Sequence, residues 1–194
     1  VVRGGTGYDL TSKLPDDIEG CYPDYSLYNI KNTAYGYLTR GCPRGCSFCV
    51  VAKKEGQKSY KVANLENFWS GQKEIKLLDP NLLACAEWKD LMQQLIDSRA
   101  YVDFTQGVDI RLMTDEKAEY IRQCKVKMIH FAWDNPNDLL TLEKLKQYVN
   151  AFGLTQRKLS VYVLTNFSST TEQDLWRVNT LRELGYTPYV MIYD

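Results

Sequence analysis

The sequence predicts an α/β protein in which parallel strands alternate with helices. Short runs rich in β-branched and aromatic residues recur along the chain, and amphipathic segments separate them. Near-continuous apolar strands of this kind are typical of a parallel sheet with helices outside it. The 194 residues are too few for a complete (β/α)8 barrel, which needs about 250. An open doubly wound sheet is the alternative, but apart from the N-terminal glycines no G-x-G-x-x-G follows a strand.

Six strands are expected, at residues 34–39, 74–78, 102–105, 127–133, 159–165 and 189–193. The helices expected between them are 65–71, 82–98, 114–123, 135–152 and 170–184. Thr114 is a typical N-cap, and Asn135-Pro136 is expected to open a helix that Gly153 closes. Segment 82–98 is expected to be one long helix because apolar residues, Ala86 among them, recur at helical spacing.

The composition is that of a globular domain with a sizeable core. Hydrophobic residues make up 44% and charged residues 25%, and 24 basic residues balance 24 acidic ones. This balance does not indicate a nucleic-acid partner. No signal peptide and no bilayer-length apolar run is found, which predicts a cytoplasmic protein without a membrane partner. A local cluster is compatible with phosphate or RNA binding, or more simply with a solvated surface: Lys53, Lys54, Lys58 and Lys61, with Tyr60.

Three cysteines in one short loop are the main functional signal. Cys42, Cys46 and Cys49 lie in the segment YLTRGCPRGCSFC. They supply three thiolates from eight consecutive residues, enough to bind three irons of a four-iron cluster and leave the fourth iron open. An open coordination position distinguishes a reactive metal site from a closed structural one. Gly41 and Gly45 allow tight turns that bring backbone N–H groups to an anionic cluster.

A zinc knuckle is the alternative interpretation of this loop. Zinc would need a fourth ligand, and the candidates all lie far away in the sequence: Cys21, Cys85, Cys124 and His130. A disulfide framework fits less well, because six cysteines in 194 residues are sparse. Cys85 and Cys124 fall in amphipathic segments and are expected to be buried. His130 lies mid-strand and is expected to belong to the core.

The loop resembles the signature of the radical S-adenosylmethionine (radical SAM) superfamily, C-x-x-x-C-x-aromatic-C. The match is complete at Cys42, Cys46, Phe48 and Cys49. The resemblance covers about residues 34–194 and implies a partial (β/α)6 barrel with outer helices that binds a [4Fe-4S] cluster and SAM. In that family the open iron chelates the amino and carboxylate groups of SAM. The reduced cluster then cleaves SAM to methionine and a 5′-deoxyadenosyl radical for hydrogen abstraction.

The resemblance also implies partners. An electron donor of the flavodoxin or ferredoxin type is expected, while the substrate stays open between a small molecule, a peptide and RNA. The reaction likewise stays open between methylthio transfer, methyl transfer and another radical-based modification. A non-catalytic iron–sulfur electron-transfer or scaffold protein is the second hypothesis, because it shares the cluster but has no reason to bind SAM.

Polar residues after the predicted strands are candidates for cofactor binding, because parallel sheets place their sites at the carboxyl ends of strands. The candidates are Asp79, Asn81, Gln106, Asp109, Arg111, Asp134 and Asn166, together with the aromatic Phe48 of the loop. Asp79 and Asn81 stand where many family members carry a glycine-glycine-glutamate triplet that binds the SAM amino group. This chain has no such triplet. The structural alternatives are a turn and helix cap at Asp79, and a purely structural pairing of Asp109 with Arg111.

Residues 33–194 are expected to be the radical SAM core, and residues 1–32 a linker or the end of an upstream Rossmann-like domain. The chain begins without methionine, and a short apolar stretch precedes Gly4, Gly5 and Gly7. This resembles the stretch that follows a cobalamin-binding domain in some radical SAM enzymes, although the motif Asp-x-His-x-x-Gly is absent. Because the chain stops directly after its sixth strand, the core is expected to be truncated at its C-terminus.

Overall fold

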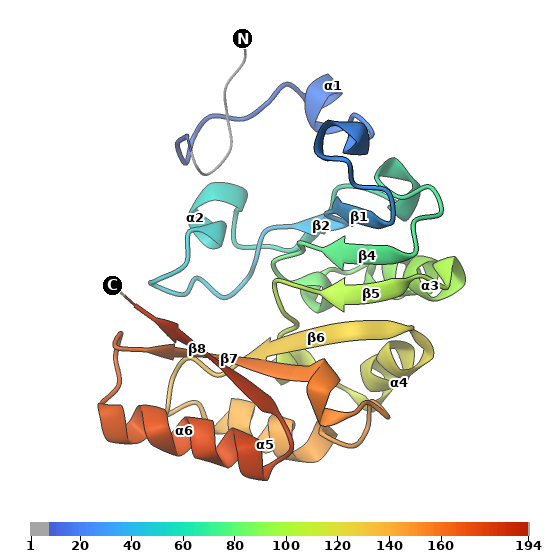
Figure 1. Cartoon of the computed structure of the whole chain (residues 1–194). Coiled ribbons are helices and arrows are strands. Elements are labelled where there is room, and N and C mark those ends of the chain that lie inside the picture. The colour runs from blue at the N-terminus through green and yellow to red at the C-terminus, as the bar shows by residue number, and fades with distance from the viewer. Residues whose placement is uncertain (1–7, 194) are drawn as a thin grey trace.

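The computed structural model describes residues 8–193, and one parallel six-stranded sheet forms its centre (Figure 1). The strands are β1 (Thr33–Gly36), β4 (Glu74–Leu77), β5 (Tyr101–Phe104), β6 (Val126–Ala132), β7 (Leu159–Thr165) and β8 (Thr187–Ile192). Their order in the sheet follows the chain, and every neighbouring pair is parallel. The predicted α/β class is therefore confirmed. Gly4, Gly5 and Gly7 lie outside the described residues.

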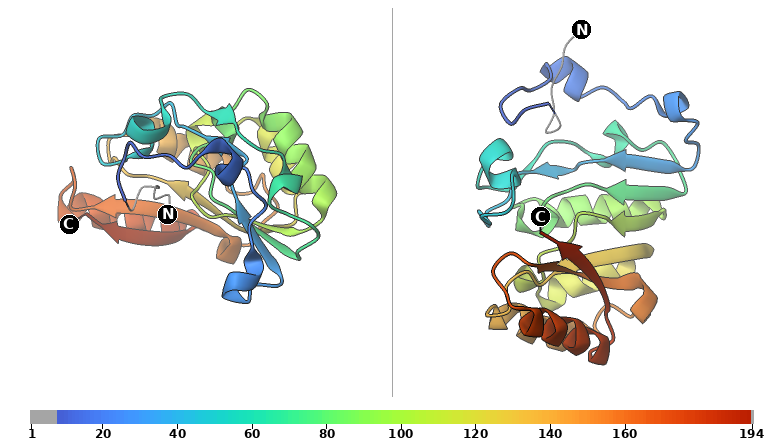
Figure 2. Two further views of the ribbon diagram at one scale, coloured as in Figure 1. Left: turned by 90° about the horizontal axis from the view of Figure 1, so that it is seen from above. Right: turned by 60° about the vertical axis from the view of Figure 1, so that its left-hand side comes forward.

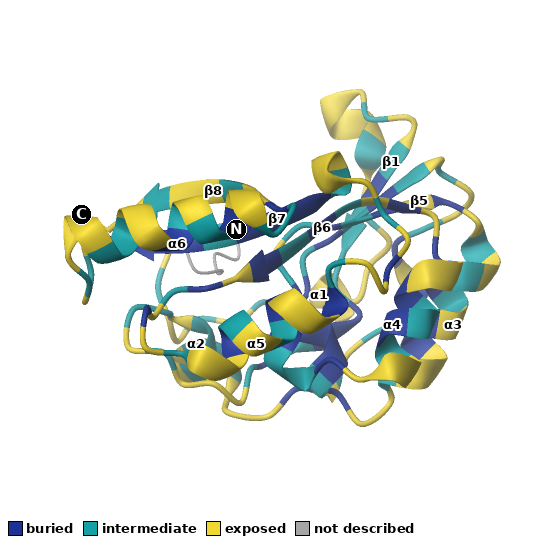
Figure 3. Cartoon of the chain, turned by 90° about the horizontal axis from the view of Figure 1, so that it is seen from below, coloured by how far each residue is buried: buried dark blue, intermediate teal, exposed yellow. Residues whose placement is uncertain are grey.

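Four helices cover one face of this sheet: α3 (Trp88–Ser98), α4 (Asp115–Gln123), α5 (Leu139–Tyr148) and α6 (Thr171–Glu183). α3 contacts α4, and α6, red in Figure 2, lies along β7 and β8. The outward faces of these helices are exposed (Figure 3). Between residues 8 and 193, no helix has the length and apolar character that a bilayer crossing requires.

Shorter elements flank this framework. The short α-helices are α1 (Asp16–Glu19) and α2 (Val51–Glu55), and β2 (Thr39–Arg40) pairs antiparallel with β3 (Tyr60–Lys61) in a separate two-stranded sheet. The 3-10 turns are η1 (Tyr25–Tyr28), η2 (Leu65–Asn67), η3 (Leu82–Ala84), η4 (Ile110–Leu112) and η5 (Gln156–Lys158).

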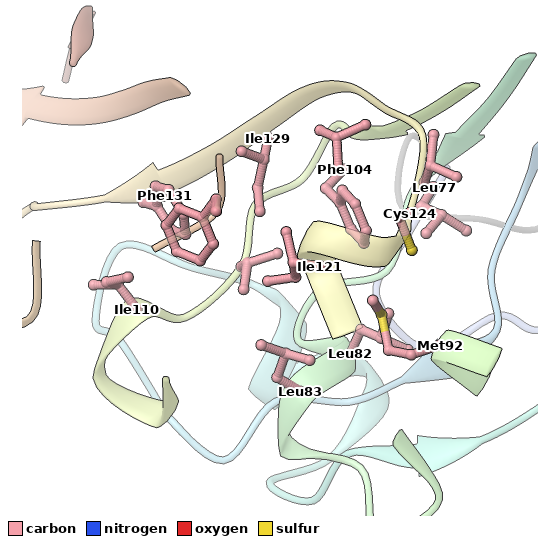
Figure 4. Packing of buried hydrophobic residues seen from close by; sticks show 14 of the residues in the cluster. Leu77, Leu82, Leu83, Met92, Phe104, Ile110, Ile121, Cys124, Ile129 and Phe131 are labelled. Atoms are coloured by element: carbon pink, nitrogen blue, oxygen red, sulfur yellow. The ribbon is translucent and has the colours of Figure 1, made fainter. Parts of the chain in front are cut away.

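The apolar core lies between the helices and the sheet face that they cover. Alternate strand residues such as Phe104 and Phe131 point into it, as the period of two along a strand requires, and meet Ile121 of α4 (Figure 4). Cys124 is buried in the same core, and this burial raises the pKa of its thiol to about 12. The expected burial of Cys85 and Cys124 is confirmed.

Several predicted elements have different bounds in the structure. Strand 34–39 is split, because the chain leaves the main sheet after Gly36 and re-pairs as β2. Helix 82–98 is also split: η3 ends at Ala84, the backbone of Cys85 after it is extended, and α3 begins only at Trp88. Ala86, expected on the apolar face of that helix, is exposed.

The helix expected from Asn135 starts at Leu139. Its N-cap is Asp138, whose carboxylate accepts a hydrogen bond from Thr141 N at 3.0 Å. The predicted helix at 65–71 is only the single turn η2, and α2 was not predicted. By contrast, β7 has the predicted bounds, and Thr170 caps α6 through a capping box, as expected of a threonine before that helix.

Candidate metal centre

The three-cysteine loop belongs to an excursion that leaves the main sheet after β1. At its neck, Cys42 N donates to Gly56 O at 3.1 Å, and Gly41 N donates to the Glu55 carboxylate at 2.9 Å. Gly41 has a φ of +79°, and a Cβ at this position would lie 2.1 Å from Lys58 O. A side chain therefore cannot be placed where the loop closes.

The loop brings Cys46 close to the ends of β5 and β6. All three thiols of the loop are free and partly exposed. Burial raises the pKa of the Cys46 thiol and nearby Asp134 raises it further, whereas the Arg111 guanidinium lowers it. Asp134 follows β6 and Arg111 follows β5, so residues far apart in sequence share one electrostatic environment with this thiol.

No three His, Cys, Asp or Glu side chains within residues 8–193 converge closely enough to hold a single metal ion. A four-iron cluster does not require such convergence, because each thiolate binds a different iron. The predicted fourth zinc ligands are dispersed: Cys21 is exposed, Cys85 and Cys124 are buried, and His130 stacks on Tyr162.

Asp79, at the end of β4, shapes the chain that leads into the loop. Its buried carboxylate accepts hydrogen bonds from Leu38 N at 3.1 Å and from both Thr39 N and Thr39 Oγ1 at 2.6 Å. Burial raises the pKa of Asp79 to about 6, although the bonds from Thr39 and Leu38 act in the opposite direction. These contacts match the structural alternative for Asp79, and SAM binding by this side chain stays a prediction.

Replacing Asp79 with asparagine should change how stability depends on pH. The pKa of Asp79 is about 6 in the folded state and about 3.8 in the unfolded chain. Below about pH 4 the carboxyl is protonated in both states, whereas between about pH 4 and pH 6 it ionises only in the unfolded chain, which favours unfolding. A shift of this size corresponds to about 3 kcal/mol. The unfolding free energy of the wild type relative to Asp79→Asn should therefore fall by about that amount between pH 4 and pH 7. Urea unfolding across this range measures the difference, and a pH-independent difference would contradict the raised pKa.

Asn81 is the side chain that links the loop to the sheet edge most directly. Its Nδ2 lies 3.6 Å from Cys42 Sγ and 3.5 Å from Asp109 Oδ2, and Ser59 Oγ donates to Asn81 O at 2.9 Å. The Oδ1 of Asn81 is buried and has no hydrogen-bond partner among the described residues. An amide N–H directed at a cysteine sulfur stabilises thiolate charge, and such bonds tune iron–sulfur sites.

Asp109 is the centre of an ion-pair network that reaches the loop. Its carboxylate binds Arg44 Nε from between the first two loop cysteines, and Arg111 Nε at 2.7 Å. Arg111 also binds the Asp138 carboxylate at 3.0 Å, which connects the network to the first turn of α5. Burial raises the pKa of Asp109, but Arg111 and Arg44 outweigh it, so the pKa lies below its ordinary value.

A buried arginine fixes the ends of β6 and β7 next to Asp134. Arg177 of α6 is fully buried, donates to Trp133 O and to Leu164 O at 2.8 Å, and pairs with Asp174. Burial raises the pKa of Asp134, and its Oδ1 is a second buried oxygen without a partner in the part of the chain that the structure describes.

The remaining predicted site residues, Phe48, Asn166 and Gln106, make separate contacts and do not form a common cluster. Phe48 packs edge-to-face on Phe167, with ring centroids 5.4 Å apart. Asn166, at a φ of +62°, donates to Tyr193 O at 2.9 Å. Gln106 is exposed and makes no side-chain hydrogen bond to the described residues.

Sequence reasoning missed four contributors to this site: Arg44, Glu55, Asp138 and Arg177. A basic residue between two cysteines was a visible signal for Arg44. The others act through contacts between distant segments and have no local motif. Comparison with protein-family models finds none that matches this chain, and a search of curated proteins finds no match.

Proposed function

We propose that this chain is the core of a radical SAM enzyme. The observation that carries the proposal is a C-x-x-x-C-x-aromatic-C loop at the carboxyl edge of a six-stranded parallel sheet whose strands follow in chain order. In this proposal the sheet is a partial (β/α)6 barrel, and Cys42, Cys46 and Cys49 bind a [4Fe-4S] cluster. When bound, the cluster and SAM supply reductive cleavage of SAM to methionine and a 5′-deoxyadenosyl radical.

The donor set and its surroundings fit this assignment. Three partly exposed free thiols provide soft ligands, and the neck of the loop fixes the chain on either side of them. The buried oxygens of Asn81 and Asp134 need hydrogen-bond donors that residues 8–193 do not supply. A bound cofactor with amino or hydroxyl groups would satisfy both.

The residues of the chain have separable roles in this scheme. Asn81 donates to the Cys42 sulfur, while Asp109 holds Arg44 and thereby orients the loop between Cys42 and Cys46. Phe48 places an aromatic ring beside the loop for a flat ligand. Arg111, whose guanidinium is already shared by Asp109 and Asp138, keeps positive charge near the Cys46 thiol. A flavodoxin- or ferredoxin-type protein would supply the electron.

Removing the loop thiols should abolish iron binding. The triple variant Cys42→Ala, Cys46→Ala, Cys49→Ala should contain no iron after anaerobic reconstitution, whereas the wild type should bind one four-iron cluster. Cys21→Ala is the matched control, because Cys21 is exposed and lies outside the loop. Iron and sulfide analysis with electron paramagnetic resonance measures the result. Stoichiometric zinc and no iron in anaerobically purified wild type would overturn the proposal.

SAM cleavage separates an enzyme from an iron–sulfur scaffold. With dithionite and SAM, the reconstituted protein should release 5′-deoxyadenosine and methionine even without substrate, because the cofactors carry the chemical step and the protein orients them. Calorimetric titration should show SAM binding to the wild type and none to the triple variant. A protein that holds the cluster but neither binds nor cleaves SAM would instead be an electron carrier or scaffold.

A further inference from the structure

The sheet face opposite the helices carries polar side chains from adjacent strands that the proposed cluster site does not use. Asp103 of β5 lies between core residues Val102 and Phe104, so it points to the other face. His130 of β6 and Tyr162 of β7 alternate with core residues in the same way. The Asp103 and His130 side chains retain 13% and 15% exposure, so the pair is reachable from this face.

These three side chains form one cluster. The His130 and Tyr162 rings stack, with centroids 4.8 Å apart and planes 5° from parallel, and His130 Nε2 lies 3.8 Å from Asp103 Oδ1. Both Asp103 Oδ1 and His130 Nδ1 are buried without a hydrogen-bond partner in the described chain. Tyr162 Oη donates to Thr105 O at 2.8 Å, which places the cluster next to the carboxyl end of β5.

The cluster presents mainly acceptors to a ligand, and its one remaining N–H, on His130 Nε2, faces Asp103 at 3.8 Å. Burial lowers the pKa of His130, against the opposing charge of Asp103, so the imidazole is neutral at pH 7. The carboxylate favours the tautomer with the proton on Nε2, which leaves Nδ1 as a lone pair. The hydrogen of Tyr162 is already given to Thr105 O, which leaves its oxygen as an acceptor.

The negative charge of Asp103 has no ion-pair partner among the described lysines and arginines. Lys76 is its register neighbour on β4, but the Lys76 ammonium lies over the Tyr35 ring, 5.9 Å from the centroid. On the far side, Tyr189 of β8 packs edge-to-face on Tyr162, with centroids 5.5 Å apart. A carboxylate beside aromatic rings and acceptor atoms repels anions and attracts cations that carry hydrogen-bond donors.

We propose that Asp103, His130 and Tyr162 form a binding site for a protonated amine. If the amine belongs to the substrate, the site rests on the proposed function, and the substrate is then an amine-bearing molecule. The methionyl ammonium of SAM is the other source of the same chemistry, and the experiment distinguishes the two.

His130 is the only histidine of the chain, so its imidazole signals in a proton–nitrogen NMR spectrum need no assignment. Methylammonium chloride should shift these signals saturably, whereas sodium acetate at equal ionic strength should not. Saturating methylammonium should also lower the pKa of His130, because an added cation opposes protonation. The charged and titratable groups of the surrounding strands are Glu74 and Lys76 of β4, Tyr101 and Asp103 of β5, Lys127 of β6, Tyr162 of β7 and Tyr189 of β8. This wild-type measurement does not depend on any variant folding.

Asp103→Asn should weaken methylammonium binding about tenfold or more, the loss expected when a charge-assisted hydrogen bond is removed. Asp97→Asn, at an exposed carboxylate of α3, is the control and should bind as the wild type does. Shifts that acetate reproduces, or that are unchanged in Asp103→Asn, would overturn the site.

SAM added to the reconstituted protein identifies the source of the amine. If SAM displaces methylammonium from the site, the site holds the methionyl ammonium; if both bind together, it holds a substrate amine. Iron content and deoxyadenosine release are measured on the wild type without methylammonium, so failure of the amine site and failure of the radical SAM proposal give different results.

Discussion

Gly41→Ala should prevent the cysteine loop from closing and should eliminate iron binding. The φ of +79° is unfavourable for alanine, and the new Cβ would lie 2.1 Å from Lys58 O, a backbone atom that moves only with the segment leading into β3. Backbone strain and overpacking together should lower the unfolding free energy by about 3–5 kcal/mol. Chemical denaturation measures the stability, and iron analysis after anaerobic reconstitution measures the site.

Gly45→Ala is the matched control within the same loop. Gly45 also has a positive φ, +55°, but a Cβ there would have space, with the nearest atom, Gln57 Nε2, at 3.7 Å. The Gly45→Ala variant should lose only about 1–2 kcal/mol of unfolding free energy, because alanine is strained in the left-handed conformation, and it should retain most of its iron. Equal losses in the two variants would mean that backbone strain, rather than the contact with Lys58, determines the role of Gly41.

Arg177→Met should give the second large effect, a loss of about 3–5 kcal/mol in unfolding free energy. The guanidinium is fully buried, and its removal leaves the Trp133 and Leu164 carbonyls without this donor and the Asp174 carboxylate without its ion-pair partner, although Ser169 Oγ still donates to Asp174. These carbonyls end β6 and β7, so Asp134 should also lose its fixed position. Urea unfolding measures the stability, and iron retention measures the effect on the site.

Arg182→Met is the control on the same helix, because Arg182 is exposed and its replacement should change stability by less than about 0.5 kcal/mol. Arg177→Lys keeps the charge but cannot form the forked contacts, so it should fall between the two. A loss in Arg177→Met no larger than in Arg182→Met would show that the buried arginine is not needed for the strand ends.

The parts of the fold that could be predicted are those that a local pattern encodes. β7 is a largely apolar run between Lys158 and Asn166, and the N-cap of α6 is a threonine with a glutamine three residues on, so both elements were placed closely. Helix 82–98 was wrong because its apolar spacing continues through Cys85, where the backbone becomes extended. At the start of α5, Asn135 and Asp138 are both typical N-cap residues, and composition alone does not choose between them.

In the candidate site, too, the residues that could be predicted are those with a local sequence signal. The three cysteines were found because their spacing is itself the signal, and Asp109 because it follows a strand. The partner of Asp109 in the loop, Arg44, lies 65 residues earlier in the sequence. The contacts that position Asp79 span 40 and 41 residues. Such pairings depend on how the strands are assembled, which a single sequence does not reveal.

The pairing of β2 with β3 makes the cysteine loop a nearly closed excursion. The chain leaves through β2 (Thr39–Arg40) and returns through β3 (Tyr60–Lys61), which pair with each other. The residues between them are therefore connected to the rest of the chain through this two-stranded stem. Lengthening or shortening that excursion would move no strand of the main sheet, and loop-closure entropy rises only slowly with length. The stem therefore allows the segment that carries the cysteines to change in length while the main sheet keeps its register, as long as the contacts of the loop with Asn81 and Asp109 are retained.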